Sequence, residues 1–218
     1  MKRQVDFSLY LVTDRKLSQS RMIEEIVSSA VRGGVTAVQI REKDCSTRKF
    51  VELARRIQSE LKPFKIPLII NDRIDVAMAI GADGVHLGQS DMPYSDARRL
   101  IGSDAIIGLS VETMEQANEA ENLDVDYLGV SPIFPTSTKT DMTTEWGIEG
   151  LRTLRTKSRH TLVAIGGINL SNAAAVIEAG ADGLAVVSAI CSSPNPEEAS
   201  RQLREVIDQK CRRERISQ

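Results

Sequence analysis

Residues 68–91 read LIINDRIDVAMAIGADGVHLGQSD, and this stretch decides the fold. Two short apolar runs, Leu68–Ile70 and Val85–Leu87, flank a segment over Ile74–Ile80 that has a helical pattern. The order therefore predicts a strand, a helix and a second strand.

Polar residues follow both predicted strands. Asp72 comes directly after Asn71 at the end of the first strand, and Asp91 ends the polar triplet after the second. Neighbouring parallel strands lie about 4.8 Å apart, so the two carboxylates would lie side by side and share one hard cation. Mg²⁺ suits such a pair, because substrate phosphates supply its other ligands. Helix capping is the alternative for each aspartate alone, ahead of Arg73 and Pro93 respectively.

The same alternation continues along the whole chain, and a helical pattern follows each short apolar run. The predicted strands are Leu9–Val12, Ala37–Ile40, Leu68–Ile70, Val85–Leu87, Ile106–Leu109, Tyr127–Val130, Leu162–Ile165 and Leu184–Val187. Regular alternation of strand and helix implies right-handed crossovers and an all-parallel sheet.

A repeated junction favours a closed barrel over an open sheet. Residues 33–38, 81–85, 124–128 and 180–184 each join a helix end to a strand start, about every 50 residues. The glycines in three of these junctions suit left-handed helix ends, and the spacing of two strand-helix units marks strands two, four, six and eight. We predict an α/β fold, a (β/α)₈ TIM barrel, as a single domain over residues 1–218. The basic tail at 210–218 is predicted to be a frayed helix end.

Composition excludes several functional classes. Lys and Arg number 28 against 30 Asp and Glu, so no global field favours nucleic acid or an anionic membrane. No stretch approaches the roughly 20 apolar residues of a membrane span, and no signal peptide is expected. Three cysteines without Cys-x-x-Cys spacing are typical of free thiols in a reducing cytoplasm. We expect a cytoplasmic protein with small-molecule partners, and the sequence leaves a homo-oligomer open.

Three polar side chains alternate with apolar ones at the second strand. Gln39, Arg41 and Lys43 share one face because side chains alternate along a strand. In a barrel with helices outside, this face points into the mouth, where two cations and an amide suit a polyphosphate. A solvated charge cluster is the alternative.

Three later loops also look functional. Residues 131–139, SPIFPTSTK, combine two prolines with three successive hydroxyls and a lysine, a set that can hydrogen-bond a small ligand. Residues 164–169, AIGGIN, and 185–190, AVVSAI, follow strands seven and eight. Barrels often bind a monophosphate there through backbone N–H groups, although a plain tight turn is the alternative. The mouth is thus predicted to hold a polyphosphate with Mg²⁺ and a monophosphate.

No nucleophile or general base is evident. His86 is interpreted as a packed, hydrogen-bonded residue of strand four and His160 as a surface residue. Ser-His-Asp order, a Walker loop and a dinucleotide fingerprint are absent from the sequence. The chemistry must then come from a metal and cations, which suits the departure of pyrophosphate.

These motifs resemble those of a known family. The matching segments are YLVTD (10–14), QIREK (39–43), INDRIDVA (70–77), GADGVHLGQSDMP (81–93), PTSTK (135–139) and AIGGI (164–168). Together they closely resemble thiamine-phosphate synthase over almost the whole chain. The resemblance implies a (β/α)₈ barrel that joins hydroxymethylpyrimidine diphosphate to a thiazole monophosphate with Mg²⁺, by a dissociative path that releases pyrophosphate first.

The resemblance also implies roles for particular residues. The pyrimidine diphosphate would be bound by Gln39, Ile40, Arg41, Glu42, Lys43, Asn71, Ser110 and Lys139. Of these, the catalytic residues would be Arg41, Lys43, Ser110 and Lys139. Asp72 and Asp91 would be the metal ligands. The thiazole phosphate would be bound by Thr136, Ser137, Thr138, Gly167, Val187 and Ser188.

Two other functions stay open at this point. A related thiazole tautomerase has the same barrel but lacks the diphosphate-binding set, whereas Arg41, Lys43 and Asn71 are all retained here. A catalytically silent phosphate-binding barrel would have no need of the Asp72 and Asp91 pair. The chain departs from the expected pattern, which is richer in proline, in the segment 140–146, which has no proline and ends in a tryptophan.

Overall fold

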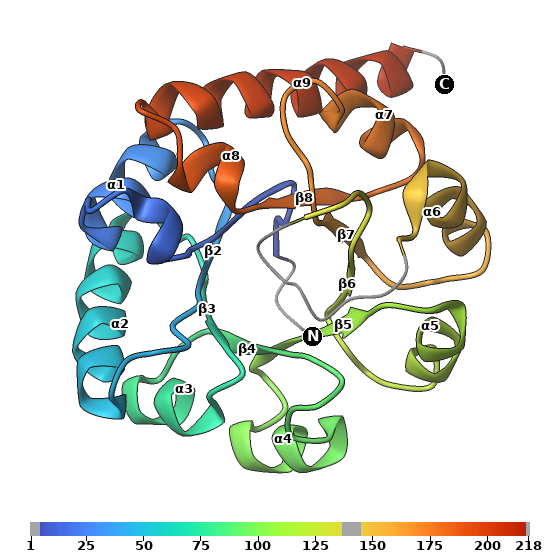
Figure 1. Cartoon of the computed structure of the whole chain (residues 1–218). Coiled ribbons are helices and arrows are strands. Elements are labelled where there is room, and N and C mark those ends of the chain that lie inside the picture. The colour runs from blue at the N-terminus through green and yellow to red at the C-terminus, as the bar shows by residue number, and fades with distance from the viewer. Residues whose placement is uncertain (1–4, 137–144, 217–218) are drawn as a thin grey trace.

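Eight parallel strands close into a barrel in sequence order, and the computed structural model describes residues 5–136 and 145–216 of the chain, with side chains up to residue 209. The strands are β1 (Leu9–Val12), β2 (Ala37–Ile40), β3 (Leu68–Asn71), β4 (Gly84–Leu87), β5 (Ile106–Val111), β6 (Tyr127–Val130), β7 (Leu162–Ile165) and β8 (Gly183–Val186). β1 pairs with both β2 and β8, which closes the ring. Figure 1 shows the strands around the centre and the helices outside them. The predicted (β/α)₈ barrel is confirmed.

Four predicted strands have the observed bounds, and the other four differ at their ends. β3 includes Asn71, which pairs with His86 of β4, and β5 runs on to Val111. β8 begins and ends one residue earlier than predicted. Hydrogen bonding along a ladder extends strands past their apolar residues, so hydrophobicity alone misplaces their ends.

Helices follow the strands and cover the outside of the barrel. They are α1 (Ile23–Arg32), α2 (Thr47–Leu61), α3 (Ile74–Ile80), α4 (Tyr94–Ile101), α5 (Met114–Ala120), α6 (Gly147–Arg155), α7 (Ala173–Glu178), α8 (Ser188–Cys191) and α9 (Pro196–Ile216), with 3₁₀ turns η1 (Lys16–Ser18) and η2 (Lys62–Phe64). In α2, Phe50, Leu53 and Ile57 form the buried stripe that faces the sheet. This amphipathic pattern is what fixes each helix against the strands.

The strands separate two apolar layers. Val38 and Ile40 face outward into the main core beneath the helices, whereas Tyr10 and Tyr127 face inward with Phe7 into a smaller core inside the barrel. Because both faces are covered, most strands are buried at every position. The cavity described below lies above this inner layer.

The repeated junction has a structural reason beyond its glycines. Just before each even-numbered strand lies a residue whose side chain accepts a hydrogen bond. The donor is a backbone N–H of the odd-numbered strand that comes before it in the sequence. The pairs are Leu9 N to Thr36 Oγ1 at 3.1 Å, Leu68 N to Asp83 Oδ2 at 2.9 Å, Ile107 N to Asp126 Oδ2 at 2.8 Å and Leu162 N to Asp182 Oδ2 at 2.8 Å. Each junction therefore fastens two strands together at their N-terminal ends.

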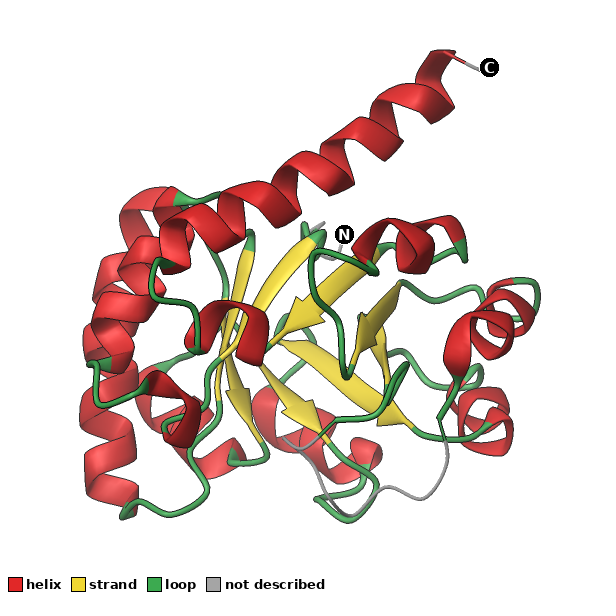
Figure 2. Ribbon diagram, turned by 45° about the horizontal axis from the view of Figure 1, so that its top comes forward, coloured by secondary structure: helices red, strands yellow, loops and turns green. Residues whose placement is uncertain are grey.

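The last helix, α9, runs to Ile216 and projects past the barrel in Figure 2. Most of the tail that was predicted to fray thus has a helical backbone. Charge pairs one turn apart support the helix ahead of the tail, including Arg204 with Asp208 at 2.5 Å. Within the described ranges, no helix is both long and apolar enough to cross a membrane.

Candidate active site

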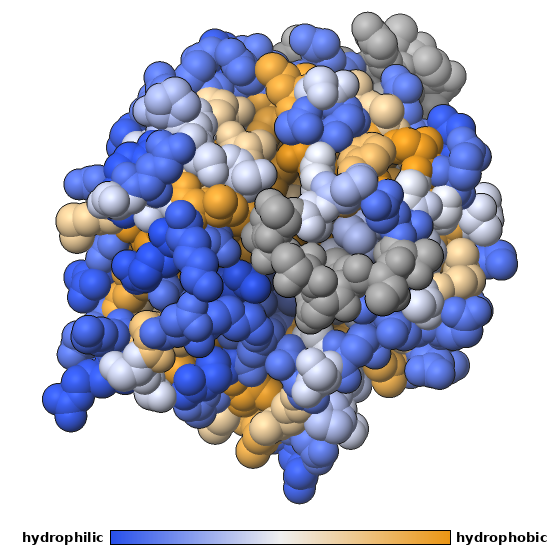
Figure 3. Space-filling view, viewed as in Figure 1, coloured by the Kyte–Doolittle hydropathy of each residue, from blue (hydrophilic) through white to orange (hydrophobic). Residues whose placement is uncertain are grey.

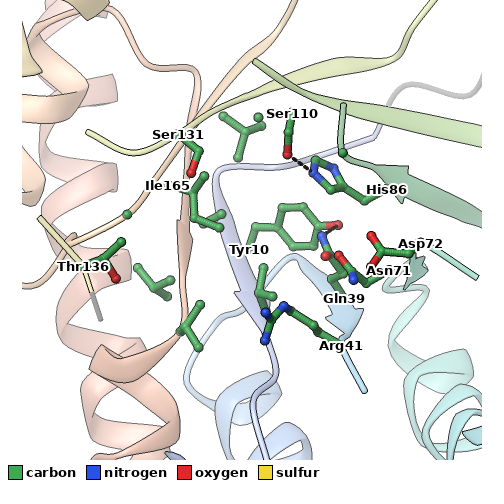
Figure 4. Close-up of a pocket in the computed structure, with 18 of the residues that line it drawn as sticks. Tyr10, Gln39, Arg41, Asn71, Asp72, His86, Ser110, Ser131, Thr136 and Ile165 are labelled. Atoms are coloured by element: carbon green, nitrogen blue, oxygen red, sulfur yellow. Dashed lines mark hydrogen bonds between the residues drawn. The ribbon is translucent and has the colours of Figure 1, made fainter. Parts of the chain in front are cut away.

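A cavity of about 640 Å³ opens at the C-terminal ends of the strands, the end where barrel active sites lie. Its walls include the following predicted site residues: Gln39, Arg41, Lys43, Asn71, Asp72, Asp91, Ser110, Thr136, Gly167, Val187 and Ser188. Figure 4 shows Asn71 and Asp72 on one side of it and Thr136 on the other. The surface in Figure 3 is mostly hydrophilic, with scattered apolar spots.

Five predicted residues are not brought to this cavity by the described structure. Ile40 is fully buried in the outer core, and the Glu42 carboxylate is bound by the Arg15 guanidinium at 2.7 and 3.0 Å. The alternation that turns Gln39 and Arg41 inward turns these two side chains away. Ser137, Thr138 and Lys139 lie outside the described residues.

The two cations that follow β2 are held by aspartates. Arg41 Nη1 donates to Asp14 Oδ2 at 3.0 Å, and Asp14 also accepts from the backbone N–H groups of Lys16 and Leu17. This buried carboxylate fixes Arg41 at the cavity wall. Lys43 Nζ donates to Asp72 Oδ2 at 2.5 Å. Two cations therefore line the cavity, each held by a carboxylate.

Asp72 and Asp91 lie together, as the predicted strand order requires. Asp72 has a left-handed backbone, with φ of 60°, and its N–H donates to His86 O of β4 at 2.9 Å. Asp91 Oδ2 accepts from Gly88 N at 2.7 Å. Burial, and after it the neighbouring Asp72 carboxylate, raises the pKa of Asp91 above its ordinary 3.8, whereas Lys43 lowers it.

The acidic pair fits a cation better than it fits helix capping. In the described part of the chain, α3 and α4 follow Arg73 and Pro93, and no side-chain hydrogen bond from these N-cap residues closes either start. Repulsion that raises a carboxyl pKa is relieved by a bound cation. The described residues contain no group of three or more His, Cys, Asp or Glu suited to a metal, so water and phosphate oxygens would complete the shell around the two carboxylates.

The glycine pair after β7 is shaped by the loop that crosses it. Gly166 and Gly167 have φ of 101° and 66°, and a Cβ on Gly167 would lie 2.7 Å from Phe134 Cβ. Phe134 N donates to Gly166 O at 3.1 Å. The glycines thus let the loop that leads to Thr136 lie directly against β7, beside the cavity.

Sequence reasoning missed three residues of the cavity floor. Tyr10, Tyr127 and His86 line the cavity, and His86 Nε2 lies 2.8 Å from Ser110 Oγ. The interpretation of His86 as a packed, hydrogen-bonded residue is confirmed, but it belongs to the site. The missed signal was the alternation of side chains along β4. Val85 and Leu87 point outward, so His86 between them points inward.

His160 was interpreted as a surface residue, and this is wrong. Only 9% of it is exposed, and its Nε2 lies 3.1 Å from Ala120 O at the end of α5. The segment between α6 and β7 folds back against α5, a contact that local polarity does not reveal.

Comparisons with known proteins agree with this geometry. The family model described as thiamine monophosphate synthase matches residues 9–190. The chain is 56% identical over 200 residues to a thiamine-phosphate synthase from Albidiferax ferrireducens, covering 92% of this chain and 91% of that protein. It is 54% identical to one from Leptospira biflexa serovar Patoc, covering 90% and 95%. A thiamine phosphate pyrophosphorylase structure from Pyrococcus furiosus has a TM-score of 0.86 at 38% identity, covering 94% and 96%. The chain therefore belongs to the thiamine-phosphate synthase family.

Proposed function

We propose that the chain is a thiamine-phosphate synthase. It would condense 4-amino-2-methyl-5-hydroxymethylpyrimidine diphosphate with 4-methyl-5-(2-phosphoethyl)thiazole, for which the carboxylated form is an alternative, and release pyrophosphate in thiamine biosynthesis. The observation that carries the proposal is the meeting of Arg41, Lys43, Asp72 and Asp91 at one side of a single cavity. Cations beside a pair of carboxylates suit a diphosphate that departs with its own counterion.

The diphosphate would be bound at the ends of β2, β3 and β4. Arg41 and Lys43 supply positive charge there, and Lys139 would add a third cation from the loop after β6. Asp72 and Asp91 would hold Mg²⁺, which when bound supplies charge neutralisation to the leaving pyrophosphate. Asp14 keeps Arg41 at the wall through its 3.0 Å hydrogen bond, so less side-chain order must be gained when substrate binds.

The pyrimidine ring would lie deeper, against the inner layer. Gln39, Asn71 and Ser110 are all at most 9% exposed and line the cavity, so they can hold a polar ring with few competing waters. A dissociative substitution needs stabilisation of the leaving group and a fixed ring, with little proton transfer. This accounts for a site whose polar groups bind and orient and supply no obvious base.

The thiazole phosphate would lie on the opposite side. Thr136, Gly167 and Ser188 line that part of the cavity, and Ser137 and Thr138 would follow from the same loop. Backbone N–H groups at glycine turns and at the start of a helical turn are suited to a phosphate. The thiazole nitrogen would then face the pyrimidine carbon from which pyrophosphate leaves.

One assay tests the proposed function. The protein is incubated with both substrates and Mg²⁺, and thiamine phosphate and pyrophosphate are measured. We expect the two products in equal amounts. Reactions without either substrate, or with a chelator, are the controls and should give neither product. An isomerised thiazole with no condensation would indicate the tautomerase, and tight binding of both substrates without turnover would indicate a silent barrel.

A further inference from the structure

Five polar side chains form a continuous hydrogen-bonded chain beneath the cavity. Gln39 Nε2 donates to Tyr10 Oη at 2.9 Å, and Tyr10 Oη lies 2.9 Å from Tyr127 Oη. Tyr127 Oη lies 2.8 Å from His86 Nδ1, and His86 Nε2 lies 2.8 Å from Ser110 Oγ. The chain links β2 to β5 through the barrel interior, and Figure 4 shows its last step between His86 and Ser110.

The barrel provides space for this chain with glycine. A Cβ on Gly108 would lie 2.1 Å from Tyr127 Cζ, and one on Gly129 would lie 2.9 Å from His86 Cε1. Both glycines are in strands where no left-handed backbone demands them, so their missing side chains are explained by the two rings.

One arrangement uses every hydroxyl proton within this hydrogen-bonded chain, and it starts from the bond that Gln39 donates. The amide nitrogen of Gln39 has only hydrogens to offer, so Tyr10 accepts there and its own proton goes to Tyr127. The Tyr127 proton then goes to His86 Nδ1, which leaves the His86 proton on Nε2, facing Ser110 Oγ. Burial raises the pKa of both tyrosines, which keeps the two phenol protons in place.

The two ends of the chain are thereby given opposite roles. Among the described residues, nothing else is bonded to Gln39 Oε1 or to Ser110 Oγ, and both residues line the cavity. Gln39 therefore offers an acceptor to a ligand, and Ser110 offers its hydroxyl proton. Reversing one end requires every proton between them to move, so neither end can change its role alone.

We propose that Tyr10, Tyr127 and His86 are positioning residues that couple Gln39 to Ser110 and make the cavity select a 4-aminopyrimidine over a 4-oxopyrimidine. The amino group donates to Gln39 Oε1, while Ser110 donates to an acceptor on the same substrate. An oxo group offers an acceptor where Gln39 offers one. To bind it, Gln39 must turn its amide and Ser110 must cease to donate, so one mismatch costs contacts at both ends.

The direction of these hydrogen bonds is tested without any ligand. The protein contains only two histidines, so long-range ¹H–¹⁵N spectra of the full-length protein at pH 8 resolve both rings, and a His160→Gln variant assigns them. We expect His86 to be neutral with its proton on Nε2. A proton on Nδ1, or on both nitrogens, would overturn the proposal.

The selectivity rests on the proposed function and is measured by binding. Dissociation constants of the 4-amino pyrimidine diphosphate and its 4-oxo analogue are compared without thiazole phosphate. In Tyr127→Phe we expect about tenfold weaker binding of the amino compound and a smaller preference for it over the oxo compound. Tyr94→Phe removes a hydroxyl that donates to Asp124 O elsewhere and should alter neither value.

The outcomes separate the two proposals. An unchanged amino-to-oxo ratio in folded Tyr127→Phe would overturn the coupling. A wild-type protein that binds neither pyrimidine would count against the proposed function. The His86 spectrum would still decide whether the hydrogen bonds from Gln39 to Ser110 run in the proposed direction. If Tyr127→Phe does not fold, the wild-type His86 spectrum alone confirms or overturns the proposed direction of the hydrogen bonds.

Discussion

Lys43 Nζ donates to Asp72 Oδ2 at 2.5 Å, so a lysine neutralises one of the two carboxylates at which Mg²⁺ is proposed to bind. The Lys43 side chain is 52% exposed and that of Asp72 is 19% exposed, so the pair lies at the rim of the cavity. Exposed pairs of this kind contribute about 0–1 kcal/mol. The contact is therefore weak enough for an incoming cation or diphosphate to break it.

Replacing Lys43 by methionine should separate its two roles. We expect kcat/KM for the pyrimidine diphosphate to fall about 100-fold, because a charge-assisted contact to the leaving group is lost. Mg²⁺ binding without substrate should become a few-fold tighter, because no lysine competes for Asp72. Steady-state kinetics and calorimetric Mg²⁺ titration measure the two effects.

Lys16→Met is the matched control for this change. Lys16 pairs with Asp44 at 3.2 Å, both are largely exposed, and neither lines the cavity. This variant should change neither value. Weaker Mg²⁺ binding in Lys43→Met would show that the lysine helps to hold the metal.

Asp91→Asn should lower turnover by at least about tenfold, or roughly 1.4 kcal/mol of barrier. The amide keeps an oxygen for the 2.7 Å hydrogen bond from Gly88 N but removes the charge that a cation needs. Activity should recover in part at high Mg²⁺ concentration, because the loss is mainly one of metal affinity. Full activity at low Mg²⁺ would remove Asp91 from the proposed metal site.

The same substitution should have the opposite effect on stability when no metal is present. The pKa of Asp91 is raised in the folded chain, so its protonated form favours folding, and this contribution is lost as pH rises through the folded pKa. In EDTA at pH 7, Asp91→Asn should therefore unfold at slightly higher urea than wild type. The difference should shrink toward pH 4 and reverse in saturating Mg²⁺, which stabilises only the form that binds it.

The strands and the carboxylate pair were predictable because they depend on local patterns. Short apolar runs mark buried parallel strands, and Asp72 and Asp91 follow neighbouring ones. The hydrogen-bonded chain from Gln39 to Ser110 was not predictable in the same way. Tyr10 and Tyr127 lie in four-residue strands buried on both faces, so hydrophobicity does not say which side faces inward.

Contacts between distant loops were also beyond the sequence. Glu42 looks like part of a charged substrate-binding run, but it is bound by Arg15, which comes from the loop after β1. The parallel pairing of β1 with β2 places those two loops beside each other. The alternation rule placed Gln39 and Arg41 correctly, and it also turns Ile40 away, so the rule was more informative than membership of the motif.

Gly167→Ala should damage both the loop and thiazole phosphate binding. Its φ of 66° disfavours a side chain, and the new Cβ would come within 2.8 Å of Pro135 O. We expect a loss of about 2–3 kcal/mol in unfolding free energy and a raised KM for the thiazole phosphate, with the KM for the pyrimidine diphosphate little changed. Urea denaturation and kinetics with each substrate varied in turn measure these effects.

Gly81→Ala is the control that isolates backbone strain. Gly81 has a similar φ of 62°, and its Cβ would meet nothing within 4 Å. It should lose only about 1 kcal/mol and keep both KM values. Equal losses in the two variants would contradict the packing of the loop against Gly167.

Asp182→Ala should destabilise the barrel without changing its chemistry. Asp182 Oδ2 accepts from Leu162 N and from Arg155 Nη1, both at 2.8 Å, at the end of the barrel opposite the cavity. Removing it leaves a backbone N–H without its partner, so we expect a loss of about 1–3 kcal/mol in urea denaturation. Asp182→Asn should lose less, because an amide oxygen still accepts from Leu162.

Glu149→Ala is the surface control, because it breaks an exposed pair with Arg152 and should cost no more than about 0.5 kcal/mol. Turnover of folded Asp182→Ala at 25 °C should equal that of wild type, and a fall in turnover would show that the two ends of the barrel are coupled.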